Sequence, residues 1–167
     1  MRSWPSIYIP QLPERFHIPA LQLFNSAANE ISEVPRQDNY RIYVCGITPY
    51  DATHLGHAAT YLIFDIAHRF LLASGSKVNF VQNVTDIDDP LLERASRDGV
   101  NWEELAQSQI DLFRADMSAL HVIPPQHYIG VVEAMPYILD AISQLDAKES
   151  TYLVDGDKYF RVHADPN

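Results

Sequence analysis

Three side chains in the first half of the chain could act together in catalysis: the thiol of Cys45 and the imidazoles of His54 and His57. A thiolate binds soft metal ions, and an imidazole donates hydrogen bonds to the negative oxygens of a phosphate. The three residues stand at the two ends of one short segment, residues 45–57. This spacing favours a site that holds a phosphorylated ligand such as ATP beside a thiol.

The elements on either side of this segment are predicted to be a strand and a helix. Residues 40–44 are rich in aromatic and β-branched side chains, as strands are. Apolar residues at helical spacing then predict an amphipathic helix over residues 58–73. These residues are Leu62, Ile63, Ile66, Ala67, Phe70 and Leu71. The first N–H groups of such a helix can bind phosphate, and Gly56 leaves room for a base or ribose against the main chain.

The pattern His54-Leu55-Gly56-His57, just after a strand, resembles the first signature of class I aminoacyl-tRNA synthetases. The similarity continues in YVCG (residues 43–46), in Thr48, and in QNVTDIDD (residues 82–89). Together these segments resemble the cysteine-activating branch of that class. The resemblance implies a Rossmann-like (HUP-type) α/β fold with a parallel sheet, of which this chain would be the N-terminal part, incomplete at its C-terminus.

Two families of this branch are compared with the chain. Cysteinyl-tRNA synthetases usually read Gly-Pro-Thr-Val-Tyr-Asp in the loop and carry an arginine after the histidines. Here Ile47 and Pro49 flank Thr48, and Ala58-Ala59-Thr60 stands where the arginine is expected. The string GITPYDATHLGHAATY (residues 46–61) and the opening MRSWP are instead similar to the mycothiol ligase family, which joins cysteine to the amine of glucosaminyl-inositol.

The resemblance assigns roles to individual residues. His54 and His57 are the implied catalytic residues, which with Gly56 hold the phosphates of ATP, assisted by Mg²⁺. The implied contacts of the cysteinyl adenylate are Cys45, Gly46, Ile47, Thr48, Thr60, Asn83, Val84 and Thr85. The lysine-rich second signature, Lys-Met-Ser-Lys-Ser, does not occur in the 167 residues, so we expect this chain alone to be nearly inactive.

Selection of cysteine over serine calls for a metal that prefers sulfur, because the two substrates have nearly the same shape. The resemblance makes Cys45 the first ligand of a Zn²⁺ ion. A lone cysteine is otherwise more often a small buried apolar residue. The sequence has no second cysteine, and its other histidines lack the spacing of a local zinc site. We therefore expect the chain alone to bind zinc poorly.

The aspartates of Thr85-Asp86-Ile87-Asp88-Asp89-Pro90 have two interpretations. Asp89 before Pro90 would cap a helix over residues 91–97, whose dipole the carboxylates would complement. The same residues could contact the ligand. N-cap preference alone accounts for the cluster, so we favour capping, although both interpretations can hold at once.

The charge balance bears on the partners. Lys and Arg number 12 against 22 Asp and Glu, a net charge of −10, which disfavours a polyanion such as tRNA. A small amino sugar is the more compatible acceptor. The chain shows no leader and no apolar run of membrane-spanning length, so we expect a cytoplasmic protein with no membrane contact, and a monomer.

We expect residues 1–39 to form an N-terminal arm and a short hairpin, and residues 40–167 the first half of the catalytic domain. The arm, Trp4 to Pro19, should lie on the surface, before a strand at Leu21–Asn25. The further predicted elements are strands at 41–45 and 77–82, a helix capped by Asn101, a helix at about 131–145, and a hairpin of 152–154 with 158–162.

Three functions remain open from the sequence. The first is an ATP-dependent ligase that activates cysteine and transfers it to glucosaminyl-inositol. The second is a cysteinyl-tRNA synthetase. The third is a non-catalytic nucleotide-binding module, which the missing second signature and zinc ligands permit.

Overall fold

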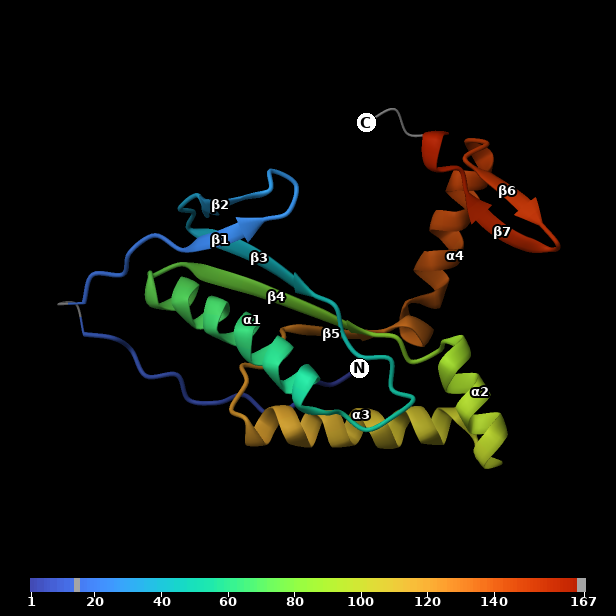
Figure 1. Ribbon diagram of the computed structural model, residues 1–167, viewed down its shortest axis with the longest axis horizontal. Coiled ribbons are helices and arrows are strands. Elements are labelled where there is room, and N and C mark those ends of the chain that lie inside the picture. The colour runs from blue at the N-terminus through green and yellow to red at the C-terminus, as the bar shows by residue number, and fades with distance from the viewer. Residues whose placement is uncertain (14–15, 165–167) are drawn as a thin grey trace. The chain divides into compact units, whose positions relative to one another are not determined.

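The computed structural model describes residues 1–13 and 16–164 of the chain (Figure 1). Contacts within the chain divide it into two compact units, Met1–Val131 and a second unit that begins at Val132. All residues of the predicted site lie in the first unit. No helix of the described residues is long and apolar enough to cross a membrane.

A three-stranded parallel sheet forms the centre of the first unit, in the order β3-β4-β5. β3 (Asn39–Val44) pairs with β4 (Lys77–Val84), and β4 pairs with β5 (His127–Gly130). Because parallel strands need crossover connections, a helix follows each of the first two strands. The arrangement confirms the predicted Rossmann-like α/β class.

Three helices make these connections. α1 (Leu55–Ala73) leads from β3 to β4, and α2 (Asp89–Asp98) and α3 (Trp102–Ala119) lead from β4 to β5 (Figure 1). Asn101 caps α3 as predicted, since its side chain accepts from the N–H groups of Glu103 and Glu104.

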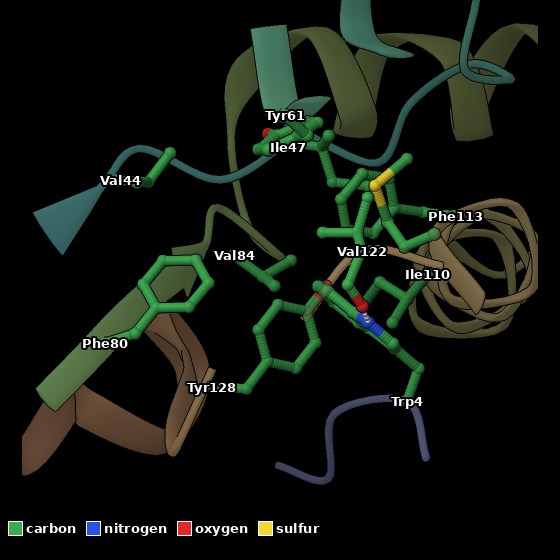
Figure 2. Close-up of a cluster of buried hydrophobic side chains, with 11 residues drawn as sticks. Trp4, Val44, Ile47, Tyr61, Phe80, Val84, Ile110, Phe113, Val122 and Tyr128 are labelled. Carbon is green, nitrogen blue, oxygen red and sulfur yellow. Dashed lines mark hydrogen bonds between the residues drawn. The ribbon is translucent and has the colours of Figure 1, made fainter. Parts of the chain in front are cut away.

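One hydrophobic cluster joins the helices to the sheet (Figure 2). Its buried members are Trp4, Val44, Ile47, Tyr61, Phe80, Val84, Ile110, Phe113, Met117, Val122 and Tyr128. Side chains alternate along a strand, so the buried residues of β4 share one face, which the residues of α1 and α3 cover. Tyr43 and Asn83 belong to the opposite face.

The N-terminal segment differs from its prediction, because Trp4 is buried rather than part of a surface arm. Its side chain is 3% exposed, and its ring meets Phe113 and Tyr128 edge to face with centroids 5.8 Å apart in both pairs. The indole nitrogen donates to the carbonyl of Val122 at 2.8 Å (Figure 2). The tryptophan thus supplies apolar area and satisfies its single donor.

The predicted N-terminal hairpin is confirmed. β1 (Gln22–Asn25) pairs antiparallel with β2 (Glu30–Glu33). The side chain of Asn25 accepts from the N–H groups of Ala27 and Ala28 and shapes the turn between the two strands.

The second unit contains α4 (Val131–Ala147, whose first residue belongs to the first unit), then β6 (Thr151–Val154), β7 (Asp157–Phe160) and a short 3₁₀ helix (Val162–Ala164). The predicted helix and hairpin are therefore confirmed. Asp155 and Gly156 have φ of 52° and 94°, as the two central residues of a type I′ turn require.

Some element boundaries near the site differ from the prediction, and one strand was not predicted. α1 begins at Leu55 instead of residue 58, so His57 lies within the helix. β4 continues to Val84 and therefore includes Asn83. Asp88, and not Asp89, is the N-cap of α2. β5 was not predicted, because its four residues follow Pro124 and Pro125 and give too short a pattern.

Candidate functional site

The predicted residues 45–48 and 83–85 meet where β3 and β4 end, whereas His54, Gly56, His57 and Thr60 lie at the start of α1. Residues 45–54 lead from β3 to α1, and residues 83–85 close β4 beside them. The N–H of Gly46 donates to Asn83 Oδ1 at 2.9 Å, and the N–H of Thr85 donates to the carbonyl of Ile47 at 2.9 Å. The structure therefore brings the segments 45–48 and 83–85 together, at the edge of the sheet where α/β folds hold their ligands.

Gly46 passes so close to β4 that no side chain fits there. A Cβ at this position would lie 1.5 Å from the carbonyl oxygen of Asn83. A main-chain atom cannot move aside as the end of a flexible side chain can. The glycine therefore fixes the direction in which the chain leaves β3.

Two of the expected adenylate contacts have buried side chains. Val84 is 0% exposed and Ile47 is 5% exposed, and both side chains belong to the hydrophobic cluster. Only their main-chain groups can face a ligand. Thr48 and Thr85 are partly exposed, so their hydroxyls remain accessible.

His54 and His57 form a capping box at the start of α1. His54 is the N-cap, and its Nδ1 accepts from the N–H of Gly56 at 3.0 Å. The Nδ1 of His57 accepts from the N–H of His54 at 3.2 Å, and the ring centroids are 4.1 Å apart. A neutral imidazole that accepts at Nδ1 carries its proton on Nε2. The pair thus has two Nε2–H donors for an anion.

The electrostatic setting of the pair suits phosphate. The first turn of α1 contains no acidic residue, so none of its own side chains neutralises the positive end of the helix dipole. Desolvation lowers the pKa of His57, and the neighbouring His54 lowers it further. The neutral form with its Nε2 donor is therefore favoured at His57.

Gly56 has a further reason to be glycine. A Cβ at this position would lie 2.8 Å from Cε1 of His54, so a side chain would displace the capping ring. Thr60 lies one turn further along α1, and its hydroxyl donates to the carbonyl of Gly56 at 3.0 Å. The hydroxyl oxygen keeps lone pairs that can accept from a ligand.

Cys45 follows the last residue of β3, and its thiol is exposed. Zinc sites need three or four ligands. Among residues 1–13 and 16–164, however, no three His, Cys, Asp or Glu side chains gather closely enough to hold a metal ion. The thiol can serve as one ligand, and the described residues do not complete a zinc site.

Sequence reasoning missed the residues that hold the loop in place. The hydroxyl of Tyr61 donates to the carbonyl of Cys45 at 3.2 Å, and desolvation, followed by the charge of Cys45, raises the pKa of Tyr61 to about 12. The hydroxyl of Thr53 donates to Asp116 on α3. These anchors come from other elements, so no local pattern reveals them.

Arg94 of α2 also binds the loop between β3 and α1. Nη1 of Arg94 donates to the carbonyl of Tyr50 at 2.8 Å and lies 2.8 Å from Oδ1 of Asp51. A hydrogen bond from Arg94 lowers the pKa of Asp51. The loop before the histidine pair is therefore tied to α2 as well as to α1, α3 and β4.

Tyr43 is the missed residue that sequence could have revealed. The predicted strand 41–45 contains Tyr43 and Cys45 two positions apart, so alternation predicts both side chains on one face. The hydroxyl of Tyr43 donates to Asn83 Oδ1 at 3.0 Å. Its pKa is raised by desolvation first and then by the neighbouring Cys45.

The aspartate cluster serves the start of α2. The side chain of Asp88 accepts from the N–H of Asp89 at 2.9 Å, and Asp89 lies in the first turn. This supports the capping interpretation, with the cap moved by one residue. Asp86 is 9% exposed and lies against Gly130, where a Cβ would come within 2.3 Å of its Oδ2.

The sequence model described as the tRNA synthetases class I (C) catalytic domain matches residues 31–167, and the chain belongs to this family. A Renibacterium salmoninarum protein named L-cysteine:1D-myo-inositol 2-amino-2-deoxy-alpha-D-glucopyranoside ligase is 58% identical over 96% of the chain. A Parafrankia protein of the same name is 52% identical over 100% of it. The chain spans 38% and 37% of these two relatives. The resemblance to mycothiol ligases is thus confirmed over nearly the whole chain.

Solved structures show the same fold. Methionyl-tRNA synthetase from Mycobacterium tuberculosis, bound by methionyl-adenylate, superposes with a TM-score of 0.59 at 20% identity, covering 77% of this chain and 30% of the synthetase. A leucyl-tRNA synthetase complex from Agrobacterium radiobacter superposes with a TM-score of 0.61 at 19% identity, covering 71% of this chain and 15% of that chain. At these identities the likeness establishes the fold alone.

Proposed function

We propose that the chain is part of an ATP-dependent ligase that activates L-cysteine and joins it to the amine of glucosaminyl-inositol, in mycothiol biosynthesis. The observation that carries this proposal is the 58% identity, over 96% of the chain, to a relative named as that ligase. The exposed thiol and the two imidazole donors at the start of α1 support it.

In the first reaction, the carboxylate of cysteine attacks the α-phosphorus of ATP. A carboxyl–phosphate bond forms, the bond to the β-phosphate oxygen breaks, and pyrophosphate leaves with its electron pair. The Nε2–H groups of His54 and His57 would donate to the phosphate oxygens, together with the positive end of α1 and the Mg²⁺ that accompanies ATP. The histidines thus stabilise charge and take no covalent part.

In the second reaction, the amine of glucosaminyl-inositol attacks the carbonyl carbon of cysteinyl adenylate. An amide forms, AMP leaves, and the amine loses a proton to solvent or to a nearby base. The contacts proposed for the adenylate are the main chain of residues 45–48 and 83–85 and the hydroxyls of Thr48, Thr60 and Thr85. Residues 45–48 and 83–85 lie where β3 and β4 end, and Thr60 lies near the start of α1.

We propose Cys45 as one zinc ligand of the whole protein, with the remaining ligands supplied from outside this chain. A bound Zn²⁺ would take the substrate sulfur directly and reject the hydroxyl of serine. The accessible thiol supports this assignment. The charge stabilisation by His54 and His57 does not depend on the metal.

Cysteinyl-tRNA synthetase is the alternative, since the matching family model is described by a tRNA synthetase domain. The net charge of −10 and the ligase names of the relatives favour the amino sugar. Both enzymes would form the same adenylate. They differ only in the acceptor.

The test uses protein made from the complete reading frame that encodes this chain. Cysteine-dependent exchange of pyrophosphate into ATP should occur, and serine should not replace cysteine. Addition of glucosaminyl-inositol should then release AMP, whereas tRNA should not. Absence of exchange would overturn cysteine activation and favour a non-catalytic module, and charging of tRNA alone would favour the synthetase. We expect residues 1–167 alone to be nearly inactive.

A further inference from the structure

Tyr43 is an exposed tyrosine whose polar end is fixed beside the proposed site. Its side chain is 62% exposed, so packing of the ring in the core does not explain why a tyrosine stands at this position. The hydroxyl donates to Asn83 Oδ1 at 3.0 Å, and the neighbouring Cys45 raises the pKa of Tyr43. The residue therefore links the end of β3 with the end of β4 on the face that α1 and α3 leave uncovered.

The side chain of Asn83 is already committed to the protein. Its Oδ1 accepts from the hydroxyl of Tyr43 and from the N–H of Gly46, which uses both lone pairs of the oxygen. Its Nδ2 donates to the hydroxyl of Thr85 at 3.4 Å. The amide therefore has no free acceptor for a ligand and acts on its neighbours.

The two hydrogen bonds to Asn83 Oδ1 lie where the main chain has little room to move. The main chain of Gly46 is pressed against the carbonyl of Asn83, and the next residue, Ile47, accepts from the N–H of Thr85. A loss of either bond to Oδ1 would let the Cys45-Gly46 peptide turn away from β4. The thiol and the first main-chain groups of the loop would then change direction together.

We propose that Tyr43 and Asn83 are positioning residues that fix Cys45 and Gly46 against β4 for the cysteine substrate. This role rests on the proposed function. Tyr43 orients Asn83, and Asn83 holds Gly46, the residue that follows Cys45. Neither side chain needs to touch the reacting carboxylate.

The test compares Tyr43→Phe with Tyr40→Phe in protein from the complete reading frame. Tyr40 is the matched control, because it lies on the buried face of the same strand and its hydroxyl donates to the carbonyl of Pro35 at 2.9 Å, away from the loop. Two quantities are measured: hydrogen exchange of the Gly46 amide, and the KM values for cysteine and ATP in pyrophosphate exchange.

Tyr43→Phe should raise the KM for cysteine by about three- to tenfold, the range expected for one lost hydrogen bond, and leave the KM for ATP within about twofold. Exchange of the Gly46 amide should become faster. Tyr40→Phe should change neither. Equal behaviour of the two variants would overturn the proposal, and so would faster amide exchange without a change in the KM for cysteine.

A second pair of variants guards against a folding defect. Asn83→Asp keeps an acceptor for the Tyr43 hydroxyl and the Gly46 N–H, so it should keep the Gly46 amide protected from hydrogen exchange. The similarly shaped Asn83→Leu should not. Equal protection in both would contradict the proposal. Lack of cysteine-dependent exchange in the unmodified protein would refute the proposed function, while the amide measurements would still decide whether Tyr43 and Asn83 hold Gly46.

Discussion

The indole nitrogen of Trp4 donates to the carbonyl of Val122 across 118 positions of sequence. The same ring packs against Phe113 of α3 and Tyr128 of β5. Residues from the start of the chain thus help to fasten the segment between α3 and the third strand. Since that strand completes the sheet, the N-terminus contributes to the stability of the unit that holds the site.

Replacement of Trp4 by alanine should lower the free energy of unfolding by about 3–5 kcal/mol, because a buried aromatic ring is removed and the carbonyl of Val122 loses its donor. Urea denaturation followed by far-ultraviolet circular dichroism measures the change. Tyr8→Ala is the control, since that side chain is 87% exposed and its loss should cost less than about 0.5 kcal/mol. Equal costs would contradict the buried anchor.

Gly46→Ala should destabilise the first unit by about 3 kcal/mol or more, because the new methyl group meets a main-chain carbonyl. Gly99→Ala offers a comparison. Gly99 ends α2 with φ of 68° in open space, so alanine there should cost about 1 kcal/mol of backbone strain. Thermal and urea unfolding of both variants would test the difference. A Gly46 variant as stable as the Gly99 variant would disprove the close approach.

Stability should fall with falling pH through the histidines of the first unit. Desolvation is the first cause of the lowered pKa of both His57 and His68, so the unfolded chain takes up protons before the folded one does. Their contribution to the folding stability is therefore complete above the pKa of the unfolded state, near 6.5. It is lost as the pH drops toward the lower pKa values of the folded state. Unfolding titrations between pH 7.5 and pH 5 would record the slope.

His57→Asn should remove part of this slope, because asparagine has an oxygen that can accept in the capping box but does not titrate in this range. His17→Asn, on an exposed side chain, serves as the comparison. A slope that His57→Asn leaves unchanged would show that the capping imidazole takes no part in the pH dependence.

Asp65→Ala should lower the free energy of unfolding by about 3–5 kcal/mol. The carboxylate is 7% exposed, accepts from the N–H of Ile123 at 2.8 Å, and pairs with Arg69 at 2.6 Å. Its removal leaves a buried donor and a cation without their partner. Arg97→Ala, which breaks an exposed pair with Asp98, should lower the stability far less than Asp65→Ala does. Similar losses of stability in the two variants would contradict a stabilising role of the buried Asp65 carboxylate.

The sequence predicted the strand, loop and helix around the site because each leaves a local pattern. Tyr40 to Val44 alternate in a strand, and Leu62 to Leu71 repeat as a helix does. The histidine pair was expected just before the helix, whereas α1 begins at Leu55 and includes His57. Its capping box was not foreseen, since histidine is an uncommon N-cap. The proposed contacts with ligand remain predictions.

The parts that sequence did not predict depend on distant contacts. β5 has four residues after two prolines, and only pairing with β4 defines it. Trp4 lies in a segment interrupted by Pro5 and Pro10, which gives no regular helix or strand pattern. The closeness of Gly46 to Asn83 depends on the register of β3 against β4. Such features become visible only when the elements are assembled.

The contacts of Trp4 with Val122 and Tyr128 can form only after most of the first unit has been translated. A ribosome adds about 5–20 residues per second, so about 6 to 25 seconds pass between translation of Trp4 and of its partners. During that interval the indole has no native surface to cover it and is open to chaperones and proteases. Trp4 is thus translated well before the residues that it packs against.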